Sequence, residues 1–119
     1  MSKLELMFEK QIELMDKLGV PYIKSPTAEF RTEEVLTEAS VGISFALTDE
    51  IHEFMRELNW KPWKKTKKIV DIVKVQNELI DCWHFLIELS VIWGLEAEDV
   101  ANLYLKKNQV NVTRQQENY

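Results

Sequence analysis

Residues 69–94, IVDIVKVQNELIDCWHFLIELSVIWG, carry the strongest structural signal in the chain. Apolar side chains recur there at intervals of three and four residues, which is the period of an α-helix and not of a strand. We therefore predict one helix from about Ile69 to Trp93, with Gly94 as its stop signal. Because apolar residues occupy much of its circumference, this helix is expected to be buried on nearly all sides.

Three more segments show helical periodicity. They are expected at about 4–18, 27–58 and 97–116, and the last begins with acidic residues that suit the positive end of the helix dipole. No segment alternates with period two over a useful length. Four helices with short connections predict an all-α four-helix bundle, organised as a single domain over residues 1–119.

Composition limits the function classes that the chain can belong to. The net charge is −5, which disfavours a protein that binds nucleic acid by neutralising its phosphates. Cys82 is the only cysteine, so an internal disulfide is excluded and a reducing compartment is expected. The first residues lack the apolar core of a signal peptide, and the longest apolar region, 82–95, is too short to span a membrane. We therefore expect a cytoplasmic protein without a membrane partner.

Two pairs of carboxylates stand at helical spacing. Glu50 and Glu53 are three residues apart in the second expected helix, and Glu78 and Asp81 are three apart in the third, so each pair projects from one helix face. Either pair alone is more often a solvated surface feature. On facing, apolar helices, however, four carboxylates would repel one another unless a cation neutralised them. Mg²⁺ is the favoured ion because it takes carboxylate oxygens and keeps waters for a phosphate substrate.

The chain's two histidines give little support to a zinc site. His84 follows Asp81 by three residues, but a lone histidine is more often a hydrogen-bonded core residue than a ligand. His52 is the other histidine, and the single cysteine adds no ligand set of the usual spacing.

Cations gather in two other places. Residues 59–68, NWKPWKKTKK, are predicted to form a loop in which tryptophan faces stand beside lysines, a combination that suits a nucleotide base and its phosphates. Loop lysines are nevertheless usually just solvated. In the last helix Lys107, Asn111 and Arg114 recur at intervals of four and three and form a stripe of hydrogen-bond donors that suits phosphate oxygens.

The order of these motifs resembles that of a known family. The four acidic residues follow the ExxE…ExxD pattern of the all-α nucleoside triphosphate pyrophosphohydrolases, which include the MazG-like proteins and the dimeric dUTPases. Residues 78–85 (ELIDCWHF) are similar to the E-L-x-D-x-x-H-F stretch of the dimeric dUTPases, and residues 107–115 (KNQVNVTRQ) to their K-N-x-x-N-x-x-R-Q motif. The resemblance is strongest to the bacteriophage dCTP/dUTP pyrophosphatases, which would put the protein in the host cytoplasm.

The resemblance implies a reaction and a role for each motif. A deoxynucleoside triphosphate would be hydrolysed to the monophosphate and pyrophosphate by a Mg²⁺-dependent homodimer. The four acidic residues would hold Mg²⁺, and Glu50 would orient or deprotonate the attacking water. The residues implied for phosphate binding are Lys61, Lys64, Lys107, Asn111, Arg114 and Tyr119, and those implied around the base and sugar are Gln11, Trp60, His84 and Asn108. Leu14 stands where an asparagine often follows Gln11 in the family, which favours action on dCTP as well as dUTP.

Two alternatives remain open from the sequence. A broader MazG-like hydrolase would act on purine triphosphates at comparable rates. A catalytically silent helical module would only dimerise or bind nucleotides, and its acidic residues would point to solvent. For the leading hypothesis a dimer or higher assembly is expected, because a four-helix chain this apolar, with Trp83 and Trp93 on one helix, has more apolar surface than one small core needs.

Overall fold

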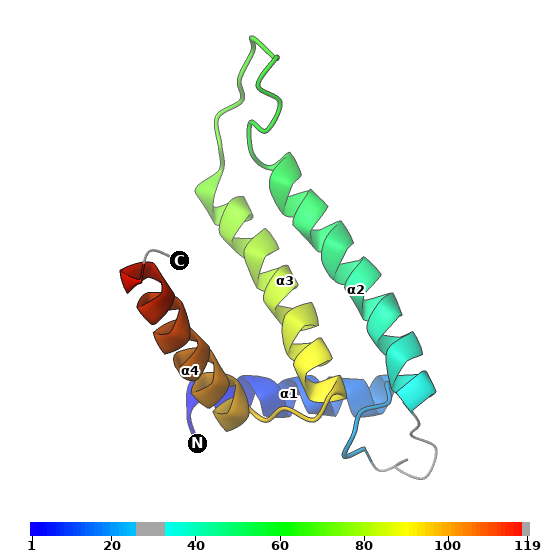
Figure 1. The fold of residues 1–119 in the computed structure, drawn as a ribbon. Coiled ribbons are helices and arrows are strands. Elements are labelled where there is room, and N and C mark those ends of the chain that lie inside the picture. The colour runs from blue at the N-terminus through cyan, green and yellow to red at the C-terminus, as the bar shows by residue number, and fades with distance from the viewer. Residues whose placement is uncertain (26–32, 118–119) are drawn as a thin grey trace.

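The computed structural model describes residues 1–25 and 33–117, and within them the chain forms four helices and no strand (Figure 1). The helices are α1 (Lys3–Leu18), α2 (Glu33–Arg56), α3 (Ile72–Ile92) and α4 (Ala97–Gln116). The prediction of an all-α chain is confirmed. The predicted start of the second helix, near residue 27, lies outside the described residues.

Local hydrogen bonds set the helix ends. Ser2 caps α1 by accepting from the Glu5 backbone N–H at 3.1 Å, and Gly19 ends the helix with a φ of 71° that favours glycine. The third helix begins at Ile72, three residues later than predicted, because the Asp71 carboxylate accepts from the backbone N–H groups of Val73 and Lys74 at 3.1 and 3.3 Å. A side chain that satisfies these first N–H groups favours the cap position itself.

Two helices form a long hairpin, and the other two lie at its base. Figure 1 shows α2 and α3 running antiparallel side by side, joined at their far end by the loop that precedes α3. Helix α1 lies across the opposite end of this hairpin, and α4 leads away from the base at an angle to α3 (Figure 1). Helix α4 contacts α1 more than it contacts the hairpin.

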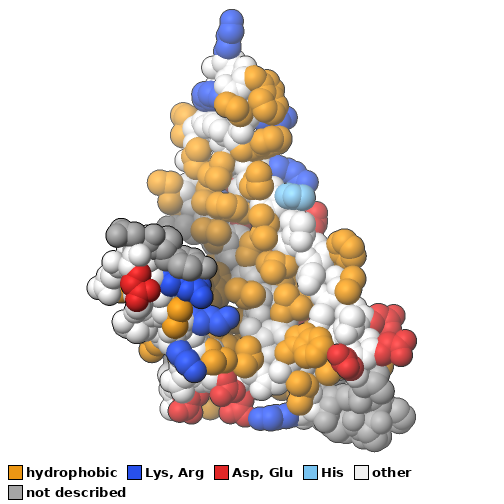
Figure 2. Space-filling model, viewed as in Figure 1, with side chains coloured by type: hydrophobic (Ala, Val, Ile, Leu, Met, Phe, Trp, Pro, Cys, Tyr) orange, Lys and Arg blue, Asp and Glu red, His pale blue; other side chains and the backbone are white. Residues whose placement is uncertain are grey.

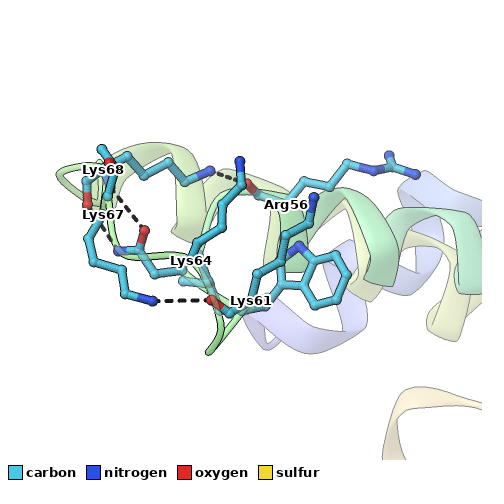
Figure 3. A pocket seen from close by; sticks show the side chains of 9 residues that line it. Arg56, Lys61, Lys64, Lys67 and Lys68 are labelled. Atoms are coloured by element: carbon cyan, nitrogen blue, oxygen red, sulfur yellow. Dashed lines mark hydrogen bonds between the residues drawn. The ribbon is translucent and has the colours of Figure 1, made fainter.

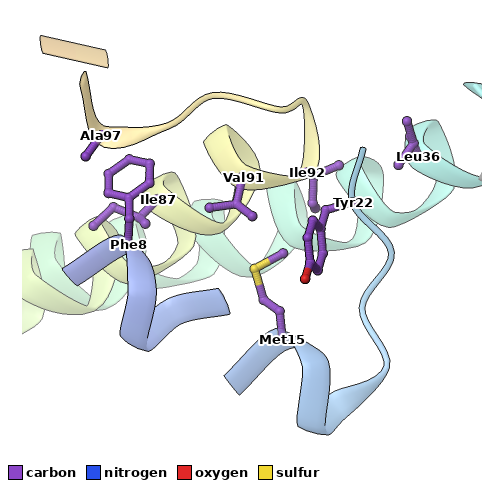
Figure 4. Close-up of a cluster of buried hydrophobic side chains, with 8 residues drawn as sticks. All are labelled: Phe8, Met15, Tyr22, Leu36, Ile87, Val91, Ile92 and Ala97. Carbon is purple, nitrogen blue, oxygen red and sulfur yellow. The ribbon is translucent and has the colours of Figure 1, made fainter. Parts of the chain in front are cut away.

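The hydrophobic core lies at this base, where α1 crosses α3. Met15 and Ile92 are fully buried there, and the remaining members of the cluster are Phe8, Tyr22, Leu36, Ile87, Val91 and Ala97 (Figure 4). The Tyr22 hydroxyl donates to Asp16 at 2.6 Å, and burial together with this carboxylate raises the pKa of Tyr22 to about 12. The indole N–H of Trp93 donates to the Ser40 hydroxyl at 2.7 Å and so ties the end of α3 to α2.

Helix α3 is much less buried in the single chain than predicted. Six of its apolar side chains are 40–66% exposed: Ile72, Val73, Leu79, Ile80, Trp83 and Leu86. The prediction of burial on nearly all sides is wrong for one chain, because α2 covers a single face of α3, α1 covers only its end, and α4 points away. The radius of gyration is 17.9 Å, well above the roughly 13–14 Å of a compact chain of this length. None of the described helices has the length and apolar character needed to cross a membrane.

Truncation at the base should be costly. Met15→Ala removes a fully buried side chain, and we expect a loss of about 2–5 kcal/mol in the free energy of unfolding, measured by urea denaturation. Leu18→Ala on the same helix removes a side chain that is 68% exposed and should change stability by less than about 0.5 kcal/mol. Equal effects of the two substitutions would contradict a core at the α1–α3 crossing.

Candidate active site

The facing surfaces of α2 and α3 change character along the hairpin. At its base they are apolar, and residues such as Ile43 pack toward the core. Toward the loop, the same helix faces carry Glu50 and Glu53 on α2 and Glu78 and Asp81 on α3, because steps of three, four and seven residues stay on one side of a helix. The hairpin therefore brings acidic side chains from two distant sequence segments face to face.

Three of these carboxylates converge. Glu50, Glu78 and Asp81 each contribute an oxygen that lies within 4.8 Å of the other two. Glu50 and Glu78 are half-buried, whereas Asp81 is exposed. The Oε2 atoms of Glu50 and Glu78 are shielded from solvent and have no hydrogen-bond partner. Buried carboxylate oxygens without a donor are unfavourable, so this cluster is unsatisfied by the chain itself.

Neighbouring negative charges also act on the carboxylates of this cluster. Burial first, and then the charge of Glu53, raises the pKa of both Glu50 and Glu78, and Asp81 adds to both shifts. The ion pairs found among the described residues join Lys10 to Glu13 and Lys24 to Glu96, and both lie elsewhere. The cluster offers carboxylate oxygens that can only accept hydrogen bonds, it carries excess negative charge, and two of its oxygens have no hydrogen-bond partner. It therefore fits a hard divalent cation such as Mg²⁺.

One more carboxylate belongs to this region. The charge of Glu57 also raises the pKa of Glu78, and Glu57 is half-buried at the loop end of the hairpin. Sequence reasoning missed it, although its spacing of four residues from Glu53 was a usable signal. Burial and the charges of Glu50, Asp81 and Glu78 raise the pKa of the Cys82 thiol, which keeps it protonated and unsuited to nucleophilic attack.

A second feature is an apolar groove of about 650 Å³ between α1 and α3. It brings together Gln11 and His84, two of the residues predicted to contact the base and sugar. The other lining residues are Leu4, Leu6, Met7, Lys10, Leu14, Ile80, Trp83 and Ile87. At about 100° per residue, Ile80 and Ile87 project from α3 on the side opposite Glu78, so the groove and the carboxylates use different faces of one helix.

The remaining predicted residues lie apart from both features. Trp60, predicted near the base, is in the loop with Lys61 and Lys64, and its ring meets that of Trp63 edge-on at a centroid distance of 5.9 Å. Lys107, Asn108, Asn111 and Arg114 lie on the exposed surface of α4. Figure 2 shows basic side chains at the tip of the hairpin and on α4, with apolar side chains covering the hairpin face between them. Tyr119, predicted to bind phosphate, lies outside the described residues.

The acidic cluster should control stability in a pH-dependent way. The folded state holds protons on Glu50 and Glu78 more tightly than the unfolded chain does, so the melting temperature of the metal-free protein should fall as the pH rises above about 4.5. Glu78→Gln should raise the melting temperature in EDTA at pH 8, and this gain should shrink toward pH 4.5. Mg²⁺ at about 100 times its Kd should raise the free energy of unfolding of the parent chain by about 2.7 kcal/mol. The same Mg²⁺ concentration should raise that of Glu78→Gln by much less.

A matched control separates the cluster from general charge effects. Glu38→Gln removes an exposed carboxylate from the same hairpin, and it should leave both the pH dependence and the Mg²⁺ response unchanged. A Glu78→Gln chain that melts no higher than the parent at pH 8 in EDTA would contradict mutual repulsion at the cluster.

Comparison with known proteins relates this geometry to a family. A family model described as dUTPase matches residues 3–92, which contain α1, α2, α3 and the carboxylates of the acidic cluster, Glu50, Glu53, Glu57, Glu78 and Asp81. A dCTP pyrophosphatase of Enterobacteria phage LZ5 is 38% identical over 71 residues, covering 50% of this chain and 41% of the relative. A dCTP pyrophosphatase of Enterobacteria phage T4 is 34% identical over 71 residues, covering 50% of this chain and 42% of the relative.

The aligned regions amount to about two fifths of the length of these curated relatives. No solved structure matches the chain. The family match nevertheless takes in three of the four helices and most of the residues, and it agrees with the relationship predicted from the order of the acidic motifs. The chain therefore belongs to this dUTPase family of helical proteins.

Proposed function

We propose that the protein hydrolyses a deoxypyrimidine triphosphate, dCTP and/or dUTP, to the monophosphate and pyrophosphate in a Mg²⁺-dependent reaction. The observation that carries this proposal is the convergence of Glu50, Glu78 and Asp81 within 4.8 Å, with two buried oxygens that lack any donor. Membership of the dUTPase family and similarity to two phage dCTP pyrophosphatases support the substrate class.

The carboxylates have two tasks in this proposal. Glu50, Glu53, Glu78 and Asp81 would hold Mg²⁺, which supplies neutralisation of phosphate oxygens and activation of water at neutral pH. Glu50 is the residue proposed to orient the attacking water and accept its proton. It comes from the helix opposite Glu78 and Asp81, so a water between the helices can approach the phosphate from the α2 side.

Substrate recognition would use the groove between α1 and α3 and the polar and basic side chains of α4. Gln11 is only 8% exposed and is one of three polar residues that line a mostly apolar groove, which suits a flat base that makes a few directed hydrogen bonds. His84 lines the same groove on the α3 side. An amide carries both donors and an acceptor, so Gln11 can pair with cytosine or uracil according to its orientation. Lys107, Asn111 and Arg114 are proposed to bind phosphates as a donor stripe.

A homodimer is part of the proposal. The chain is extended, and large apolar side chains remain exposed on both long helices, for example Phe45 at 73% on α2 and Leu86 at 50% on α3. Contiguous apolar surface of this kind is typical of an interface. A second copy would bury these faces and bring an additional set of α4 donors to the assembly.

Turnover should identify the reaction and the base. We expect Mg²⁺-dependent pyrophosphate release from dCTP or dUTP that exceeds release from dTTP and dATP, measured with the full chain. Glu78→Gln should reduce kcat by more than about a hundredfold, because removing a direct metal ligand should cost more than removing an outer-shell partner.

Glu38→Gln, an exposed acid on the same hairpin, should retain the parent rate. Comparable rates on purine and pyrimidine triphosphates would replace the proposal with a broad-specificity hydrolase. The absence of turnover on all four would favour a silent nucleotide-binding or dimerisation module.

The assembly can be measured separately. Sedimentation at micromolar concentration should give a mass near twice the 14.1 kDa of one chain. A single species of 14.1 kDa under these conditions would contradict the homodimer and leave the proposed reaction to be judged on its own assay.

A further inference from the structure

One buried carboxylate has no role in the site described above. Glu88 lies near the base of α3, is only 7% exposed, and is followed on the same helix by the core residues Val91 and Ile92. Its carboxylate takes part in no hydrogen bond or ion pair within residues 1–25 and 33–117. Burial alone raises the pKa of the Glu88 carboxyl. A carboxylate in such surroundings is unfavourable unless a hydrogen-bond donor reaches it.

The cations of the loop between α2 and α3 are too far away to supply this donor. A pocket of about 380 Å³ in this cationic loop is lined by basic residues that include Lys61, Lys64, Lys67 and Lys68 (Figure 3). The loop joins the two helices at the far end of the hairpin (Figure 1). At 1.5 Å per residue, Glu88 lies about 24 Å along the α3 axis from the start of that helix at Ile72.

The helix itself leaves one candidate donor for Glu88. A helical side chain meets those three and four positions away, and a long side chain leans back over the preceding turn. The following turn offers only apolar side chains, Val91 and Ile92. The preceding turn offers Phe85 and His84, of which the histidine alone carries a side-chain N–H group. The geometry therefore directs the Glu88 carboxylate toward this imidazole.

His84 lies between this carboxylate and the groove formed by α1 and α3. It lines the groove together with Ile87. Around the α3 axis, at 100° per residue, His84 projects about 60° from Ile87 and about 40° from Glu88, which lies on its other side. One edge of the imidazole can therefore face the groove while the other edge faces Glu88.

Other polar groups compete for each member of this pair. Asp81 precedes His84 by three residues and is an alternative acceptor, although it also belongs to the acidic cluster with carboxylates from α2. On α1, Lys10 is the charged residue that lines the groove, and Gln11, only 8% exposed, is an alternative donor to Glu88. Each of these alternatives leaves the ring of His84 independent of Glu88, which is a measurable difference.

We propose that Glu88 is a positioning residue that accepts a hydrogen bond from one ring nitrogen of His84 and so turns the other nitrogen toward the groove. The proposal rests on the proposed function for the identity of the ligand in the groove. A neutral imidazole whose N–H group is bound to a carboxylate presents its second nitrogen as an acceptor. The N3–H group of uracil and the amino group of cytosine are donors for such an acceptor. The pair therefore suits either pyrimidine, and Glu88 acts without touching the nucleotide.

The test is the ring tautomer of His84, measured from its nitrogen chemical shifts by NMR in the full chain at pH 8 without nucleotide. We expect one tautomer in the parent chain and a mixture of both in Glu88→Met, which removes the acceptor but keeps a side chain of similar length. Glu88→Gln retains a carbonyl oxygen and should restore part of the parent spectrum. His52, an exposed histidine on α2, is the internal control, and its spectrum should be the same in all three chains.

Nucleotide binding gives a second measurement that needs no turnover. Calorimetric titration with dCMP or dUMP in EDTA should give a Kd about three- to tenfold weaker for Glu88→Met than for the parent chain, because a ring without a fixed tautomer loses a directed hydrogen bond. Glu38→Gln removes an exposed carboxylate from α2 and should leave this Kd unchanged. Melting curves should show Glu88→Met to be no less stable than the parent, since an apolar side chain suits this buried position.

An unchanged His84 tautomer in Glu88→Met would overturn the proposal and leave Asp81 or Gln11 as the partner in its place. Failure of the parent chain to bind either monophosphate, or an equal Kd for the parent and Glu88→Met, would overturn the role of Glu88 in the groove. A chain that shows the expected tautomers and Kd values but hydrolyses no nucleotide would contradict the proposed function alone.

Discussion

The packing of α2 against α3 is the interaction on which the candidate site depends. The two helices come from separate parts of the chain, and only their antiparallel contact brings Glu50 within reach of Glu78 and Asp81. At the base the contact is apolar and is reinforced by the hydrogen bond from Trp93 to Ser40. Toward the loop it becomes a contact between like charges. Apolar packing at the base therefore offsets the electrostatic repulsion near the loop. A bound cation would relieve this repulsion.

Helix α3 organises the other features around this contact. One of its faces carries the carboxylates, the opposite face forms the groove with α1, and its first turn follows the cationic loop. Three different surroundings thus adjoin one helix: an acidic cluster, a mostly apolar groove and a basic loop. The exposed apolar side chains on α3 fit the same picture, since a helix that serves three surfaces cannot be covered by the rest of a single short chain.

Much of this could be predicted from the sequence because the signals are local. Helical periodicity and the glycines at positions 19 and 94 are read within one or two turns, and all four helices were anticipated. The predictions were wrong where a side chain competes for backbone N–H groups, and where burial depends on segments distant in the sequence. The start of α3 moved because the Asp71 side chain captures two backbone N–H groups. The burial of α3 was overestimated because an apolar circumference shows that a helix needs partners but not whether its own chain provides them.

The acidic residues could be picked out from their spacing alone, since residues three apart share a helix face whatever the fold. Spacing could not show that Glu50, rather than Glu53, completes the close trio with Glu78 and Asp81, nor that Glu57 acts on Glu78, because register between two helices depends on side-chain packing along their whole contact. The same holds for the grouping of Gln11 with His84 and for the separation of Trp60 from them. Chemical identity and local conformation are properties of short segments, whereas proximity across the fold exists only once the helices have packed.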